Sequence, residues 1–212
     1  MPIEGAGMTD ATLVLDIDGV VSLAHPGSAR PWYTGMKEAL GLEPEHMQLH
    51  FFRTPVFLEV LRGRQDLRVA MNDYLEPLGL ADRMDELIAW WFAQDSVLDR
   101  EVLRLADAWR LRTGGRVFAA TNQEHHRSAY LRDTAGLSAH FDEIVYSAAL
   151  GVCKPDRVFY SNAQMRMKVA NVRSILFVDD TAANVDGARA CGWQAMLYRG
   201  RDSLAAALDR WG

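Results

Sequence analysis

Short apolar runs alternate with longer amphipathic stretches in the second half of this chain. Four of the runs predict strands, at about residues 116–120, 141–146, 174–178 and 194–198. Apolar residues at helical spacing predict helices between and after them, at about residues 124–134, 155–167, 182–191 and 203–211. One further run, at about residues 12–16, predicts a strand near the N-terminus. Alternation of strand and helix is typical of a parallel α/β sheet.

The stretch between the first predicted strand and the second has a different pattern, with helical periodicity and little strand signal. Helices are predicted at about residues 31–40, 55–62, 66–75, 84–92 and 99–112. We therefore expect an α/β fold with a parallel sheet core and an inserted all-helical cap domain. The expected boundaries are residues 8–21 and 110–212 for the core and residues 22–109 for the cap.

Composition narrows the classes of partner. The 212 residues carry 23 basic and 28 acidic side chains, well mixed, for a net charge of −5. Without a basic stripe, nucleic acid is not an expected partner. No apolar run reaches the length of a membrane span, and residues 1–10 lack the features of a signal peptide. Either Met1 or Met8 can be the start, and a small molecule is the expected partner.

The two cysteines, Cys153 and Cys191, form neither a disulfide framework nor a zinc-binding spacing. This usage is typical of a reduced compartment, so a cytoplasmic location is expected.

Polar side chains follow three of the predicted strands. They are Asp16 and Asp18, then Thr121 and Asn122, then Asp179 and Asp180, while Lys154 begins a predicted helix. Because ligands bind at the carboxyl ends of parallel strands, we expect these groups to converge on one crevice. Four carboxylates in one place repel each other, which a lysine and a divalent cation would relieve. Mg²⁺ prefers such hard oxygen ligands, and the set suits phosphoryl transfer.

Four segments carrying these residues resemble the motifs of the haloacid dehalogenase-like (HAD) hydrolase superfamily. They are Asp16-Ile17-Asp18-Gly19-Val20-Val21, Ala120-Thr121-Asn122, Lys154-Pro155-Asp156 and Phe177-Val178-Asp179-Asp180-Thr181. Each motif is weak alone, but four in the right order are highly specific. The resemblance spans the chain from its first to its last strand and implies a Rossmann-like core. The inserted helices resemble the C1 cap of that superfamily.

The resemblance also implies a role for each matching residue. Asp16 matches the nucleophile that forms an aspartyl-phosphate, and Asp18 matches the general acid and base. Thr121 and Lys154 complete the implied catalytic set. The implied phosphate-binding residues are Asp16, Asp18, Gly19, Thr121, Asn122 and Lys154. The implied Mg²⁺ ligands are Asp16, Asp18 through its backbone carbonyl, Asp180, and Asp179 directly or through water.

Two positions bear on which chemistry is expected. Dehalogenases of this superfamily lack an acid at the position of Asp18, because a halide leaves without a proton whereas an alkoxide needs one. Asp18 therefore favours a Mg²⁺-dependent phosphatase acting on a small phosphorylated metabolite, by analogy a sugar phosphate. Asn184 stands where many relatives carry a further acid. The alternatives are a phosphomutase, a 2-haloacid dehalogenase, or a non-catalytic binding protein, and either a monomer or a homodimer is compatible.

Side chains in the expected cap are weaker candidates. His25, Arg53, Arg62 and Arg64 can each bind a substrate anion, although surface positions are commoner. Trp90, Trp91 and Phe92 are expected to fill the cap core. Phe51 and Phe52 precede a loop that can face the active site, so their role stays open.

Overall fold

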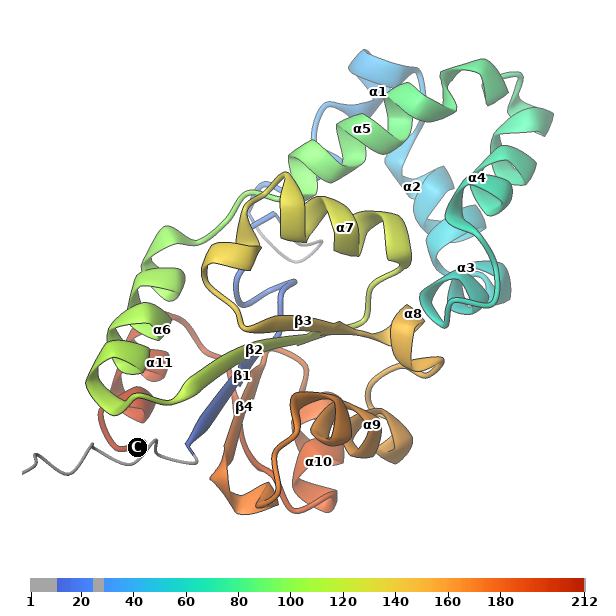
Figure 1. The fold of residues 1–212 in the computed structure, drawn as a ribbon. Coiled ribbons are helices and arrows are strands. Elements are labelled where there is room, and N and C mark those ends of the chain that lie inside the picture. Colours follow the sequence, from blue (N-terminus) through green and yellow to red (C-terminus); the bar gives the residue numbers. More distant parts are fainter. Residues whose placement is uncertain (1–10, 25–28, 212) are drawn as a thin grey trace, which may run out of the picture.

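A parallel sheet forms the centre of the molecule in the computed structural model, which describes residues 11–24 and 29–211 (Figure 1). His25, Met1 and Met8 lie outside the described residues. The five strands follow the order β3-β2-β1-β4-β5, and every neighbouring pair is parallel. Their bounds are β1 Thr12–Leu15, β2 Arg116–Thr121, β3 Glu143–Tyr146, β4 Ile175–Asp179 and β5 Gln194–Leu197.

Strand β1 lies in the middle of the sheet. Its last residue, Leu15, pairs with Ala119 of β2 on one side and with Val178 of β4 on the other. This register brings the carboxyl ends of three strands to the same edge of the sheet, where parallel α/β proteins bind ligands. The predicted Rossmann-like fold class is confirmed.

Helices cover both faces of the sheet, so its strands are apolar almost throughout. On one face Leu13, Leu15 and Val117 pack against α6 (Arg100–Thr113), α7 (His125–Asp133) and α11 (Arg201–Leu208). On the other face Val14 and Phe177 pack against α9 (Arg157–Met167) and α10 (Ala182–Ala190). The alternation of residues 13, 14 and 15 between the two faces is the period of two of a strand.

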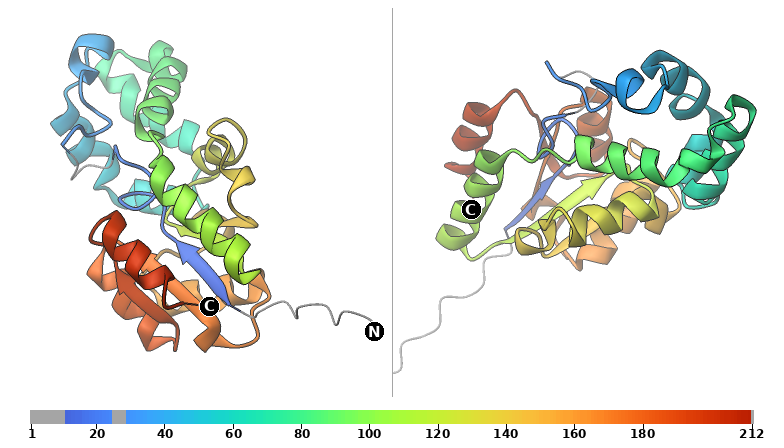
Figure 2. Two further views of the ribbon diagram at one scale, coloured as in Figure 1. Left: turned by 90° about the vertical axis from the view of Figure 1, so that its left-hand side faces the viewer. Right: turned by 90° about the horizontal axis from the view of Figure 1, so that it is seen from above.

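The chain between β1 and α6 is helical and has its own apolar cluster. Its α-helices are α1 (Met36–Leu40), α2 (Pro44–Met47), α3 (Pro55–Leu61), α4 (Leu67–Leu75) and α5 (Met84–Asp95). A π-helical turn, residues 48–52, follows α2. Trp32, Met36, Phe51 and Trp91 are among the residues that fill this cluster. Figures 1 and 2 show these helices gathered beside the sheet rather than on one of its faces.

Two chain segments connect these helices to the sheet, and they pair with each other. Ser22 and Leu98 form an antiparallel bridge. The backbone N–H of Leu23 donates to the Val97 carbonyl at 2.8 Å, and that of Asp99 donates to the Val21 carbonyl at 2.7 Å. The outgoing and returning segments therefore lie side by side at one place.

Some predicted element bounds differ from the structure. The boundary at residue 109 put most of the helix at 99–112 in the cap, whereas α6 packs on the sheet through Val102, Leu103, Ala106 and Trp109. Its amphipathic pattern looks the same whichever partner it has, so periodicity could not decide this. The helix predicted from residue 155 begins at Arg157, with Asp156 as its N-cap and Pro155 before it in a cis peptide. The helix predicted from residue 31 begins at Met36.

Two short helices had no counterpart in the prediction, α2 and α8 (Ser147–Leu150), since four residues are too few to show a period. Within the described ranges, every helix is too short or too polar to cross a membrane.

Candidate active site

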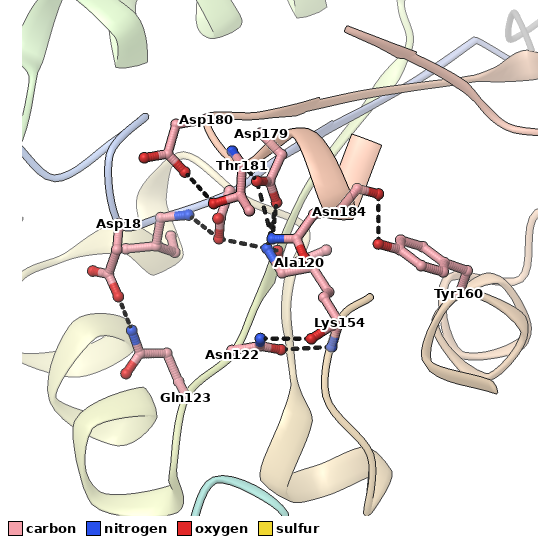
Figure 3. A network of polar contacts seen from close by, with 12 residues as sticks. Asp18, Ala120, Asn122, Gln123, Lys154, Tyr160, Asp179, Asp180, Thr181 and Asn184 are labelled. Atoms are coloured by element: carbon pink, nitrogen blue, oxygen red, sulfur yellow. Dashed lines mark hydrogen bonds and ion pairs between the residues drawn. The ribbon is translucent and has the colours of Figure 1, made fainter. Parts of the chain in front are cut away.

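Lys154 joins the ends of three strands through its side chain, which is 1% exposed. Its Nζ lies 2.8 Å from Oδ1 of Asp16, the residue after β1. It also donates to Oδ2 of Asp179, at the end of β4, at 2.7 Å, and to the carbonyl of Ala120 in β2 at 2.9 Å (Figure 3). Three of the residues named from the sequence are therefore in direct contact.

The charges in this contact are unbalanced. Burial raises the pKa of Asp16 well above its ordinary value, and Asp179 adds to the rise while Lys154 opposes it. Burial alone would lower the pKa of Lys154, but the carboxylates of Asp16 and Asp179 raise it. Lys154 thus stays charged, and one ammonium cannot neutralise the carboxylates around it. The site favours a further positive charge.

Asp179 is held in one orientation by several donors. Both of its oxygens accept from Nδ2 of Asn184, at 3.0 and 3.1 Å, and the backbone N–H of Thr181 donates to Oδ1 at 2.8 Å. The Tyr160 hydroxyl in turn donates to the Asn184 carbonyl at 2.6 Å. Asn184 therefore positions Asp179 by hydrogen bonding.

Three carboxylates form a group that can hold a metal ion. Oxygens of Asp16, Asp179 and Asp180 all lie within 4.8 Å of one another. A glycine at position 19 lets the Asp180 carboxylate lie close to the backbone after β1. Its φ is +79°, and a Cβ there would lie 2.0 Å from Oδ2 of Asp180. Oxygen donors of this kind fit Mg²⁺. The carboxylate of Asp18 is not part of this group.

The Asp18 carboxylate instead accepts hydrogen bonds from two residues that the sequence analysis did not single out. Nε2 of Gln123 donates to its Oδ2 at 2.5 Å, and Nη2 of Arg127 donates to its Oδ1 at 3.0 Å (Figure 3 shows the Gln123 contact). The Arg127 guanidinium is buried and also lies 3.0 Å from Oδ2 of Asp95 at the end of α5. These donors fix the direction of the Asp18 carboxylate.

The pKa values of Arg127 and Asp95 are both raised in this buried ion group. Burial lowers the pKa of Arg127, but Asp18 and Asp95 more than offset this and raise it. Burial raises the pKa of Asp95 to about 7, against the opposing effect of Arg127. Asp95 lies 32 residues from Arg127 in the chain, so no local motif could have linked them.

A cavity of about 180 Å³ opens beside Asp18, between the sheet core and the inserted helices. It is lined by Asp18, Trp32, Gln48, Phe52, Phe57, Leu61, Trp91, Asp95, Asn122, Gln123 and Arg127. Trp91 belongs to the apolar cluster of the inserted helices, as predicted, and also faces this cavity. Phe52, whose role the sequence left open, lines the cavity as well.

The remaining candidate residues from the sequence differ in how close they lie to the site. Thr121 is the last residue of β2 and is buried. The side-chain amide of Asn122 exchanges two hydrogen bonds with the backbone of Lys154, at 2.8 and 3.1 Å, so it holds the lysine loop. Arg62 and Arg64 pair with Glu59. Neither they nor Arg53 lines the cavity beside Asp18.

Comparisons with known proteins agree with this arrangement. The sequence matches the family described as haloacid dehalogenase-like hydrolase over residues 11–192. No curated protein matches it. An HAD family enzyme of Bacteroides thetaiotaomicron, solved as a complex with magnesium and inorganic phosphate, is 17% identical, with a TM-score of 0.70 over 89% of this chain and 94% of that one. A 2-haloacid dehalogenase from Pseudomonas syringae pv. tomato is 19% identical, with a TM-score of 0.66 over 95% and 99%.

Proposed function

Because the chain belongs to the haloacid dehalogenase-like hydrolase family, we propose that it is a Mg²⁺-dependent phosphatase acting on a small phosphate ester. One observation carries the choice of a phosphatase over a dehalogenase. The Asp18 carboxylate, two residues after Asp16, is fixed by Gln123 and Arg127 at the wall of a cavity. A leaving alkoxide in that cavity would need a proton, and Asp18 is placed to supply it.

In the proposed first step, a carboxylate oxygen of Asp16 attacks the phosphorus and the bond to the ester oxygen breaks. Asp18 gives its proton to that oxygen, so an alcohol leaves and an aspartyl-phosphate remains. In the second step Asp18 takes a proton from a water molecule. The water oxygen attacks the phosphorus, the bond to Asp16 breaks, and inorganic phosphate leaves.

Several groups would hold the phosphoryl oxygens during these steps. Lys154 is a fixed cation beside Asp16, and its low exposure strengthens its attraction for the phosphoryl group. The Thr121 hydroxyl and the backbone N–H groups of Asn122 and Gly19 are the proposed donors. The Asn122 side chain acts by positioning Lys154 instead.

The proposed Mg²⁺ ligands are Asp16, Asp180 and the backbone carbonyl of Asp18. Asp179 already accepts hydrogen bonds from Lys154, Asn184 and Thr181, so we propose that it takes part through water. When bound, Mg²⁺ neutralises charge on the phosphoryl group and on Asp16. The similar HAD family enzyme of Bacteroides thetaiotaomicron was solved with magnesium, which supports this choice of metal.

We also propose that the helices α1–α5 act as a cap that excludes bulk water from the ester. Their contribution to the cavity supports this role, since Trp32, Phe52, Phe57 and Trp91 all come from this part of the chain.

A phosphate-release assay with Mg²⁺ and a generic aryl phosphate tests the function. Wild type should turn over, and Asp16→Asn should reduce kcat by at least about three orders of magnitude while circular dichroism stays unchanged. The matched control is Asp186→Asn, an exposed aspartate of α10, which should keep wild-type kcat. A folded wild type that hydrolyses no phosphomonoester would contradict the proposal. Halide release from a 2-haloacid, or transfer of phosphate to a second sugar hydroxyl, would identify a dehalogenase or a mutase instead.

A further inference from the structure

Four of the residues that line the cavity are aromatic, and their rings contact one another. The ring centroid of Phe52 lies 5.5 Å from that of Trp32, 5.0 Å from that of Trp91 and 4.9 Å from that of Phe57. The corresponding interplanar angles are 79°, 71° and 88°, so the rings pack edge to face. Such packing is favourable and holds each ring in place. Leu61 adds a further apolar side chain to this lining.

Most polar groups of the cavity are already engaged with each other, although Nη1 of Arg127 has no hydrogen-bond partner among the described residues. Gln123 and Arg127 donate to Asp18, and Arg127 also contacts Asp95. The Asn122 amide is engaged with the backbone of Lys154. Among the described residues lining the cavity, Gln48 and the indole N–H of Trp32 are the polar groups outside these networks, since the indole of Trp91 donates to Asp95. A sugar would bring several hydroxyl groups here and find few partners for them, which is unfavourable.

The charge and size of the cavity restrict its occupant further. Arg127 is the one cation among the described lining residues, and it is matched by Asp18 and Asp95. No lining cation is therefore left over for a second anionic group on the substrate. The volume of about 180 Å³ is close to the roughly 150 Å³ of an apolar protein cavity that binds benzene. The pocket is partly open to solvent, and its volume accommodates one ring.

We propose that the ester carries an uncharged aromatic leaving group about the size of a single ring, an inference that rests on the proposed phosphatase function. The ring would lie between Phe52 and Leu61, with its ester oxygen facing Asp18. This substrate class differs from the sugar phosphate that analogy alone favoured. Phe52 and Leu61 are then specificity-determining residues.

Three esters of similar leaving-group chemistry test the inference: benzyl phosphate, glucose 6-phosphate and methyl phosphate. All release an alkyl alcohol, so they differ mainly in what fills the cavity. Wild type should show a kcat/KM for benzyl phosphate at least about 10-fold above that for either of the others, about 1.4 kcal/mol in transition-state binding. Equal or better use of glucose 6-phosphate would overturn the aromatic assignment and leave the phosphatase proposal intact.

A filled cavity supplies the second test. Leu61→Trp should reduce kcat/KM for benzyl phosphate at least about 10-fold more than it reduces kcat/KM for methyl phosphate. Leu58→Trp is the matched control, because Leu58 lies on the same helix α3 but is 39% exposed and does not line the cavity. Circular dichroism checks that both variants fold. If Leu61→Trp does not fold, the wild-type ranking of the three esters decides.

Binding of the leaving group alone separates the two proposals. Saturation-transfer NMR with benzyl alcohol should show contact with wild type and with Leu58→Trp, and not with Leu61→Trp. Contact without hydrolysis of any ester would overturn the phosphatase proposal and keep the aromatic site. Hydrolysis without contact would overturn the aromatic site.

Discussion

The guanidinium of Arg127 lies 3.0 Å from the Asp18 carboxylate and is 1% exposed, so a buried cation on α7 orients the proposed acid/base group. The same guanidinium reaches Asp95 on α5 at 3.0 Å. One side chain therefore connects the loop after β1, a helix of the sheet core and a helix of the insertion. Breaking such a buried ion group leaves an uncompensated charge, which is strongly unfavourable.

Arg127→Met should lower the free energy of unfolding by about 3–5 kcal/mol, because Asp18 and Asp95 lose their shared buried cation. It should also lower kcat, since Asp18 loses one of its two donors. Urea unfolding and a pH–rate profile measure the two effects. Arg132→Met, which removes an exposed ion pair on the same helix, is the control and should change little. An Arg127→Met variant as stable as wild type would show that the contacts of Arg127 with Asp18 and Asp95 contribute nothing to the free energy of unfolding.

The stability of the protein should fall as pH rises from about 4 to about 7 on account of Asp95. Burial raises its pKa in the folded state to about 7, above the ordinary value of 3.8, so the folded state binds the proton more tightly than the unfolded state. Asp95→Asn should remove this contribution and flatten the profile in that window. Thermal melts at pH 4.5, 5.5, 6.5 and 7.5 test it, and each 1 kcal/mol would appear as about 2–4 °C. Parallel profiles for the two proteins would contradict the assignment.

Mg²⁺ should stabilise the folded protein through Asp180. At a concentration 100 times Kd, a metal that binds the native state adds about 2.7 kcal/mol, which corresponds to about 5–10 °C in Tm. Asp180→Asn should lose most of this shift, because the carboxylate group of Asp16, Asp179 and Asp180 is then incomplete. Asp186→Asn, an exposed aspartate outside the group, should keep it. The readout is Tm with Mg²⁺ or with EDTA, and an unaltered shift in Asp180→Asn would remove Asp180 from the metal site.

Gly19→Ala should abolish the Mg²⁺-dependent rise in Tm as well as activity. The new Cβ would lie 2.0 Å from Oδ2 of Asp180 and would displace that carboxylate. The matched control is Gly79→Ala, where φ is +69° and no atom lies within 4 Å of the added Cβ. Both variants carry the strain of a left-handed residue, about 1–2 kcal/mol, but only Gly19→Ala meets the metal site. Equal responses to Mg²⁺ in the two variants would contradict this role for Gly19.

The sequence was sufficient for the sheet and for the acids at its carboxyl edge. Apolar runs predict strands directly, and Asp16 and Asp179 stand at run ends that a parallel register must bring together. Lys154, placed at a predicted helix start, contacts both of them. The residues that hold Asp18 were missed for a physical reason. Gln123 and Arg127 follow β2 in a helix start that looks like many others, and their partners lie about 30 to 110 residues away.

The cavity was equally beyond a pattern-based prediction. An aromatic residue that faces a cavity and one that faces the core of the inserted helices have the same helical spacing. Trp91 does both, since it packs on Phe52 and lines the space beside Asp18. Only the packing of helices from distant parts of the chain decides between the two positions.

The paired segments at Ser22 and Leu98 have a consequence for how this protein can evolve. The segment that leaves the sheet core and the segment that returns to it are adjacent. The backbone N–H of Leu23 donates to the Val97 carbonyl at 2.8 Å. Insertions whose ends meet in this way are tolerated with little effect on the host domain. A different helical segment, longer or shorter, could therefore replace residues 24–96 by recombination while the catalytic edge of the sheet kept its register. Substrate preference and the proposed phosphoryl chemistry could then be inherited separately.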